Sequence, residues 1–138
     1  MRDLPRQLSA DELAELFSGR SALVERLAEI EDPLGRADDV ARTLTDAEKL
    51  EALATHPRIG EPSQEQHGDD PEVLAELAAL NRAYEEKFGF RFIVFVNRRS
   101  RGELLLVLRE RLGRTHEQEL DTALRELAAI ARDRWSRR

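Results

Sequence analysis

Residues 69–89 read DDPEVLAELAALNRAYEEKFG and carry the signals of one long amphipathic helix. Pro71 directly follows an aspartate, which is typical of a helix start, because proline lacks the N–H that would go unbonded in the first turn. Gly89 is a typical residue just past a helix end. The apolar side chains between them recur every three or four residues, at Val73, Leu77, Leu80, Tyr84 and Phe88. The stretch therefore predicts a helix over residues 71–88.

Similar signals predict helices on both sides of this stretch. Four capping boxes, in which Ser or Thr is followed three residues later by Glu or Gln, begin at Ser9, Thr45, Ser100 and Thr115. Each box precedes apolar residues at helical spacing, and a further apolar series ends before a turn at residues 32–35. No internal repeat or second domain is apparent, so we expect one helix-rich domain over residues 1–138.

The composition excludes several classes of protein. The 138 residues are 41% hydrophobic and 36% charged, as in a globular protein. The formal net charge of -6 argues against nucleic acid or an anionic membrane as partner, because those surfaces bind basic patches. The absence of cysteine excludes disulfides and thiolate sites. Residues 1–6 lack a signal-peptide core and the apolar runs are too short to span a bilayer, so we expect a cytoplasmic protein.

Residues 90–96, FRFIVFV, are the one β-like run of the sequence. A single strand has no partner for its backbone N–H and C=O groups. We therefore expect a short extended segment near residues 91–96, with some backbone groups free to bind a ligand.

A loop rich in Pro and Gly, HPRIGEPSQEQ at residues 56–66, places a histidine near a carboxylate. The helix that Thr45 opens, with Leu50 on its inward face, must end near His56, because Pro57 disfavours the helical conformation before it. The helix dipole there favours imidazolium by about 0.3–1 kcal/mol. Glu65 is near enough in sequence to return and raise the imidazole pKa, although it also fits a solvated loop residue. His56 either transfers protons or only bonds the last carbonyls of the helix.

Arg134 follows Ile130 by four residues and lies in line with the apolar stripe of the last helix. Either its stem covers apolar surface while the guanidinium reaches water, or the guanidinium is a fixed fork for a planar anion. His67 and His116 are the other histidines available for a metal site, but their spacing matches no strong ligand pattern. We expect no metal.

Three motifs occur in order: LATHPRIG at residues 53–60, the pair Glu65-Gln66, and LNRAYEEKFGFRFI at residues 80–93. Together with residues 109–112 and 130–134, they resemble the 2-oxo-4-hydroxy-4-carboxy-5-ureidoimidazoline (OHCU) decarboxylases of urate breakdown. The resemblance covers residues 45–136 well and the N-terminal third loosely. It implies an all-α, compact helical domain that converts this small molecule to (S)-allantoin and carbon dioxide, with no metal or organic cofactor. It also makes a homodimer plausible.

The matching positions imply roles for individual residues. His56 corresponds to the catalytic histidine, taken as the proton donor, Glu65 to the essential glutamate, and Arg134 to an arginine that reaches the substrate. Backbone groups of Phe92 and Val94 are expected to point at the imidazoline ring. The positions that match substrate contacts are Pro57, Ser63, Gln66, Phe92, Ile93, Val94, Phe95 and Val96.

Two features depart from the family pattern. The loop between Gly60 and Glu65 is shorter, so that Ser63 lies two residues before the glutamate rather than three. His67 stands where the family often has a small residue, and it either titrates near the site or faces solvent. These departures leave two alternatives: a helical interaction module without activity, and a related decarboxylase that acts on another ureido or imidazoline acid.

Overall fold

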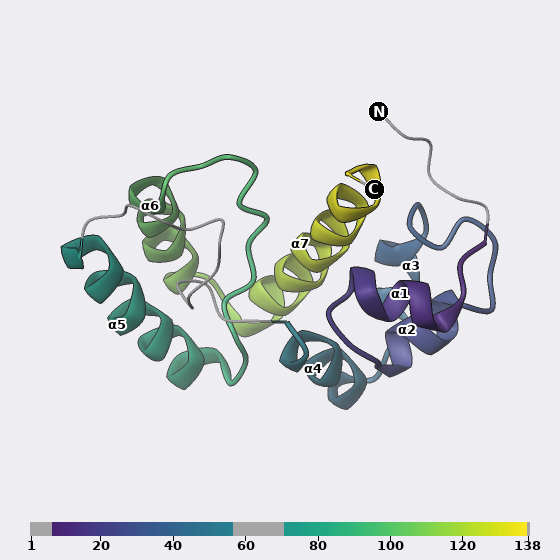
Figure 1. Cartoon of the computed structure of the whole chain (residues 1–138). Coiled ribbons are helices and arrows are strands. Elements are labelled where there is room, and N and C mark those ends of the chain that lie inside the picture. The colour runs from purple at the N-terminus through teal and green to yellow at the C-terminus, as the bar shows by residue number, and fades with distance from the viewer. Residues whose placement is uncertain (1–6, 57–70, 138) are drawn as a thin grey trace.

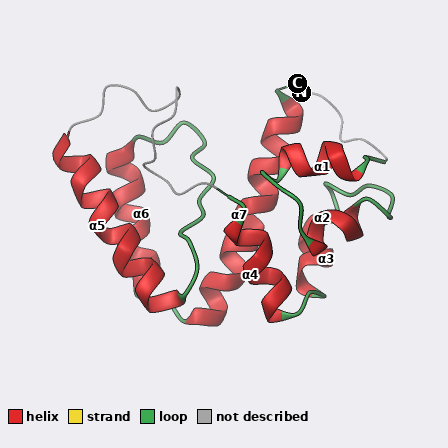
Figure 2. Ribbon diagram, turned by 60° about the horizontal axis from the view of Figure 1, so that its bottom comes forward, coloured by secondary structure: helices red, strands yellow, loops and turns green. Residues whose placement is uncertain are grey.

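The computed structural model describes residues 7–56 and 71–137, and the secondary structure in these ranges is helical (Figure 1, Figure 2). This confirms the all-α fold expected from the sequence. The helices in chain order are α1 (Ala10–Leu16), α2 (Ala22–Leu27), α3 (Ala37–Arg42), α4 (Asp46–Ala54), α5 (Pro71–Phe88), α6 (Arg101–Leu112) and α7 (His116–Ser136).

Helix α7 runs through the middle of the molecule (Figure 1). On one side of it α1, α3 and α4 contact α7, and α2 packs against these three helices. On the other side α5 and α6 lie side by side and run in the same direction (Figure 2). Their connection must return along the pair, a distance of about 20–25 Å, which roughly seven residues cover only when extended. The extended segment is thus a consequence of two parallel helices joined in sequence.

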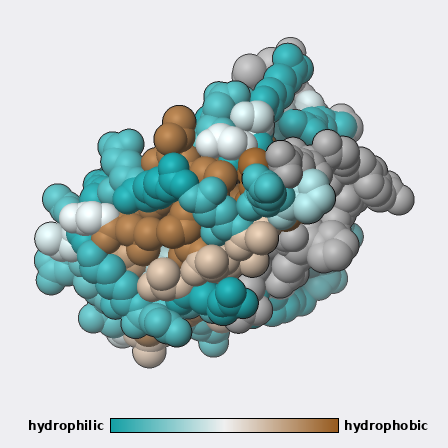
Figure 3. Space-filling model, turned by 90° about the vertical axis from the view of Figure 1, so that its left-hand side faces the viewer, coloured by the Kyte–Doolittle hydropathy of each residue, from teal (hydrophilic) through white to brown (hydrophobic). Residues whose placement is uncertain are grey.

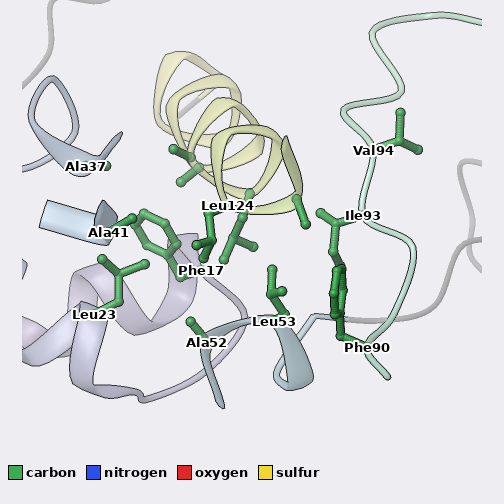
Figure 4. Close-up of a cluster of buried hydrophobic side chains, with 14 of the residues drawn as sticks. Phe17, Leu23, Ala37, Ala41, Ala52, Leu53, Phe90, Ile93, Val94 and Leu124 are labelled. Carbon is green, nitrogen blue, oxygen red and sulfur yellow. The ribbon is translucent and has the colours of Figure 1, made fainter. Parts of the chain in front are cut away.

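One continuous hydrophobic core joins the two sides. Figure 4 shows part of this core, in which Phe17 of α1, Leu53 of α4 and Leu124 of α7 come together. Ile93 of the extended segment lies in the same cluster and is fully buried. The segment is therefore held between the α5–α6 pair and the helices around α7.

The four predicted capping boxes are all present, at the starts of α1, α4, α6 and α7. Helix α3 was not predicted. Its N-cap residue, Arg36, makes no side-chain capping bond, so the sequence holds no start signal there. The inward position expected for Leu50 is wrong, since this side chain is 37% exposed. Helix α4 is buried through Ala52 and Leu53 instead.

Residues 91–96 are extended and pair with no strand in the described part of the chain, as expected. Side chains bond the backbone in place of a neighbouring strand. Arg111 of α6 donates to the Ile93 carbonyl at 2.7 Å, and Arg99 donates to the Phe95 carbonyl at 2.5 Å. The carboxylate of Glu126 on α7 accepts from the Phe95 N–H at 3.4 Å.

Apolar side chains reach the surface on the side of α5 and α6 (Figure 3). Leu106 of α6 is 64% exposed, the highest value among the large apolar side chains of the described ranges. None of the helices described has both the length and the apolar character needed to cross a membrane.

Candidate functional site

His56 lies just beyond the C-terminus of α4, where Thr55 is the C-cap. Its backbone N–H donates to the Leu53 carbonyl at 3.2 Å, which holds residue 56 against the last helical turn. The Nδ1 atom of its imidazole is buried and has no hydrogen-bond partner among the described residues. Buried polar atoms are normally hydrogen-bonded, so this nitrogen is available to a ligand or to a part of the chain outside those residues.

Arg91 bonds the same end of α4 from the extended segment. Its Nη1 atom donates to the Ala54 carbonyl at 2.9 Å and to the His56 carbonyl at 2.7 Å. An arginine is well suited to this position, because the last carbonyls of a helix have no partner within the helix and form the negative end of its dipole. The first residue of the extended segment thus caps α4.

The end of α1 approaches α4 from the other direction. The Thr55 hydroxyl bonds the Phe17 carbonyl at 3.3 Å and the Ala52 carbonyl at 2.9 Å. Gly19 has a φ of +154°, and a Cβ atom there would lie 3.0 Å from the Thr55 Cβ. A glycine is therefore needed at residue 19 for α1 and α4 to meet this closely.

Arg134, near the end of α7, reaches the same place. Its Nη1 atom donates to the Leu16 carbonyl at 2.9 Å and to the Ser18 hydroxyl at 2.6 Å. The guanidinium is half-buried and held by protein groups at the end of α1. It is thus fixed in place, as the anion-binding interpretation requires, rather than extended into water.

Burial lowers the pKa of His56 from 6.5 to about 4, with the positive charges of Arg134 and Arg91 as further causes. The expectation of a raised pKa from the helix dipole is wrong for these surroundings. Two guanidinium charges and a low-polarity environment outweigh a dipole effect of about 0.3–1 kcal/mol. In the absence of ligand, His56 is neutral at pH 7.

The extended segment forms a second part of the site. Phe92, Ile93 and Val94 are buried, and Phe95 and Val96 are partly buried. The backbone of Phe92 and Val94 makes no hydrogen bond with any described residue, whereas Ile93 and Phe95 are bonded by α6, α7 and Arg99. Groups alternate in direction along extended chain. The backbone groups of Phe92 and Val94 therefore point away from the side on which Ile93 and Phe95 are hydrogen-bonded.

A buried ionic cluster supports the segment from that side. Glu119 of α7 is fully buried and accepts from the Tyr84 hydroxyl at 2.6 Å, from Arg111 Nε at 2.7 Å and from Arg114 at 3.1 Å. The guanidinium of Arg111 also lies 4.5 Å from the centre of the Phe92 ring. Burial and the bond to Glu119 raise the pKa of Tyr84, so its hydroxyl stays protonated and donates. The cluster fixes where Ile93, and hence the segment, lies.

The structure brings His56 and Arg134 together at the meeting point of α1, α4 and α7. Pro57, Ser63, Glu65, Gln66 and His67 lie outside the described residues, so their predicted places are not tested. Sequence reasoning missed Arg91. The signal that could have identified it is a single charged residue between two apolar ones, Phe90 and Phe92.

A model of the OHCU decarboxylase family matches residues 2–136 of the sequence. The chain belongs to the OHCU decarboxylase family. The fold agrees with a solved structure of an OHCU decarboxylase determined in the presence of (S)-allantoin, with a TM-score of 0.78 and 27% identity, covering 91% of this chain and 96% of that one. A solved structure of an (S)-allantoin synthase matches with a TM-score of 0.73 and 25% identity, over 91% of this chain and 47% of that one.

The chain spans less than two thirds of the length of two curated relatives that it matches. A 2-oxo-4-hydroxy-4-carboxy-5-ureidoimidazoline decarboxylase of Halalkalicoccus jeotgali is 32% identical over 112 residues, which are 70% of this chain and 64% of the relative. A uric acid degradation bifunctional protein of Bacillus sp. (strain TB-90) is 27% identical over 147 residues. That match covers 91% of this chain and 29% of the Bacillus protein, so the family domain is one part of a longer protein there.

Within residues 7–56 and 71–137, no group of three or more His, Cys, Asp or Glu side chains is arranged to hold a metal ion. Two of the three histidines, His56 and His116, lie in these ranges. His116 begins α7, and its ring packs edge-on against Phe90 with the ring centres 5.5 Å apart. It is therefore part of the aromatic cluster beside the extended segment.

Proposed function

We propose that this chain decarboxylates OHCU to (S)-allantoin without a metal or organic cofactor, as a single domain over residues 1–138. One observation carries the proposal: a buried imidazole nitrogen without a partner among the described residues lies beside two fixed guanidinium groups. The arrangement suits a small acid, because guanidinium groups bind carboxylates and the imidazole can move a proton. Family membership makes OHCU the best-supported acid.

The reaction breaks the bond between the carboxylate and a ring carbon. The electron pair stays on that carbon and is delocalised into the neighbouring ring carbonyl, while carbon dioxide leaves. Donors fixed near the developing negative charge stabilise it. Arg134 is the charged donor, and the N–H groups of Phe92 and Val94 are unbonded within the described residues.

A proton must then reach the same ring carbon, and we assign its delivery to His56. The imidazole is neutral in the ligand-free protein, because its pKa is about 4. A bound substrate carboxylate adds a negative charge that offsets the two arginines and raises this pKa. His56 thus takes up its proton after the substrate binds and donates it once carbon dioxide has left.

Glu65, Pro57, Ser63 and Gln66 complete the proposed site. A carboxylate hydrogen-bonded to the imidazole stabilises its protonated form, which is the role we propose for Glu65. Pro57, Ser63 and Gln66 are proposed to contact the substrate, as the family motif implies. We propose a cytoplasmic location, with which the lack of cysteine agrees.

The test follows (S)-allantoin by circular dichroism after OHCU is generated freshly in the cuvette. The purified protein is expected to accelerate its formation over the spontaneous reaction, with and without a chelator. Replacement His56→Ala should abolish the acceleration while the far-ultraviolet spectrum stays unchanged. No acceleration by the wild type would favour the interaction module or the related decarboxylase, and a rate lost to chelator would contradict the absence of a metal.

We also propose that the chain forms a homodimer. Apolar side chains gather at the surface on the side of α5 and α6 (Figure 3), and Leu106 of α6 is 64% exposed. A contiguous apolar patch at a surface often marks an interface, which supports the proposal. Glu103, Arg109 and Glu110 flank Leu106 on the same helix, and charges of both signs suit a face that meets its own copy.

A further inference from the structure

We infer that Arg91 is a positioning residue that holds His56 and the extended segment in register across the site, an inference that rests on the proposed function. Among the described residues, Arg91 is the one whose hydrogen bonds directly join the extended segment to the end of α4, where His56 lies. Its side chain bonds the Ala54 and His56 carbonyls, and its own backbone begins the segment that continues to Phe92.

The first step is the geometry at α4. Both bonds come from one nitrogen, Nη1, at 2.9 and 2.7 Å. The His56 carbonyl belongs to the peptide group that follows the His56 Cα atom, so the bond fixes how this peptide group is oriented at the end of α4. The imidazole is attached to the same residue, and its orientation depends on that peptide group.

The second step is the geometry of the segment. Arg111 holds the Ile93 carbonyl and Arg99 holds the Phe95 carbonyl, so the segment is fixed to α6 and to its own turn. Neither of these contacts reaches α4. Ile93 packs in the same core cluster as Leu53 of α4, and the bonds of Arg91 add the hydrogen-bonded link, through which the backbone of Phe92 keeps a defined distance from His56.

The third step is the charge of Arg91. The described elements around His56 contribute two charged groups that act on it, Arg134 of α7 and Arg91 of the segment. The end of α1 contributes the Leu16 carbonyl and the Ser18 hydroxyl, both bonded by Arg134 and neither charged. Arg91 therefore helps keep His56 neutral until an anion binds.

A pocket of about 380 Å³ lies beside this link. It is lined by Leu50 and Ala54 of α4, Glu85 of α5, Gly89, Phe90 and Arg91. Space on one side of Arg91 allows a shorter or uncharged side chain to be placed there without a clash. Substitution of Arg91 therefore tests the bonds and the charge rather than close contacts of the core.

The experiment compares Arg91→Met with the wild type in two measurements. Steady-state kinetics with OHCU should show kcat reduced about 10- to 100-fold and KM changed less than about threefold, because misalignment of reacting groups by about 1 Å costs on this order. Nuclear magnetic resonance titration of the histidine rings should show the pKa of His56 rising above its wild-type value of about 4 but staying below 6.5, because burial and Arg134 still lower it. Arg82→Met, an exposed arginine of α5, is the matched control and should change neither value.

Arg91→Lys supplies the rescue. An ammonium group can donate to both carbonyls and keeps the charge, so the His56 pKa should stay low and kcat should recover to within about tenfold of wild type. If Arg91→Met does not fold, Arg91→Gln replaces it, with the same expected rise in pKa. A neutral variant with kcat within twofold of wild type and an unchanged His56 titration would overturn the inference.

The two measurements also separate this inference from the proposed function. A wild type that does not accelerate the reaction would contradict the decarboxylase proposal, while the titration would still report whether Arg91 acts on His56. A catalytically active wild type with an insensitive Arg91 would contradict only the positioning role.

Discussion

His56 couples proton binding to folding because it is buried in its neutral form. Its pKa is 6.5 in the unfolded chain and about 4 in the fold. Between these values the unfolded chain binds a proton that the folded protein excludes, so the stability present above pH 6.5 is lost as the pH falls toward 4. The full shift corresponds to about 3 kcal/mol at 1.36 kcal/mol per unit.

Urea denaturation at pH 7 and at pH 4.5 measures this loss, with His56→Gln as the comparison. We expect the wild type to lose about 2–3 kcal/mol more than the variant between the two pH values. The other titrating groups are common to both proteins and cancel in the difference. Equal losses in the two proteins would show that the imidazole is not buried in its neutral form.

The place of His56 at the end of α4 could be predicted from the sequence, but the direction of its pKa shift could not. Pro57 ends the helix at residue 56 wherever the helix lies in the fold. The pKa depends instead on Arg91 and Arg134, which are 35 and 78 residues away in sequence and become neighbours only through folding. Local rules therefore gave the place of the side chain and the wrong direction for its pKa.

At the scale of elements, the extended segment depends on the buried cluster of Glu119, Tyr84 and Arg111. Glu119 is fully buried and Arg111 is nearly so. Glu119→Ala is expected to cost roughly 3–5 kcal/mol of unfolding free energy, because the charge of Arg111 stays buried without its counter-charge. Chemical denaturation measures this loss. Glu117→Ala, at an exposed position two residues earlier on α7, is the control and should change stability by less than about 0.5 kcal/mol.

The double variant Arg111→Met with Glu119→Leu tests whether the unpaired charge of Arg111 causes the loss of stability in Glu119→Ala. Removal of both charges should recover much of the lost stability, since an apolar pair of similar volume often replaces a buried ion pair without loss. A double variant as unstable as Glu119→Ala would show that the hydrogen bond to Tyr84, not the unpaired charge, is what matters.

Elements with local signals were predicted and those without were not. Ser9, Thr45, Ser100 and Thr115 each begin a helix through a capping box that the sequence displays. Helix α3 begins at Ala37 after an N-cap, Arg36, that makes no such bond, and it is held by its contacts with α2 and α7. The β-branched and aromatic residues of 91–96 indicate extended chain in the sequence, whereas the side chains that bond this segment come from α6, from α7 and from Arg99.

At the scale of the whole molecule, the exposed Leu106 predicts the state of association. We expect a dimer in light scattering coupled to size exclusion at micromolar concentration, and a monomer after Leu106→Gln, because an amide in the centre of an apolar contact loses its water without gaining a partner. Leu50→Gln is the control, because Leu50 is an exposed leucine on another helix, α4. A monomeric wild type, or a dimer unaffected by Leu106→Gln, would contradict the prediction.

All the described helices except α3 were predicted one by one, but their mutual positions were not. Arg134 was expected to point inward because it follows the apolar stripe of its helix. Its contact with Ser18 joins residues 116 positions apart, and no local pattern specifies such a pair. The family resemblance implied that Arg134 and His56 both act on the substrate. The end of α1, which holds Arg134 through Leu16 and Ser18, became visible only in the fold.

The central position of α7 has a consequence for how the protein is made. Helices α1, α3 and α4 are translated first, yet they contact a helix that emerges from the ribosome roughly 80 residues after α4 ends. At roughly 5–20 residues per second this delay is about 4–16 s. During that time α1, α3 and α4 can pack against α2, but the faces that they bury against α7 have no partner, so the nascent chain offers chaperones a binding site that closes only when α7 arrives.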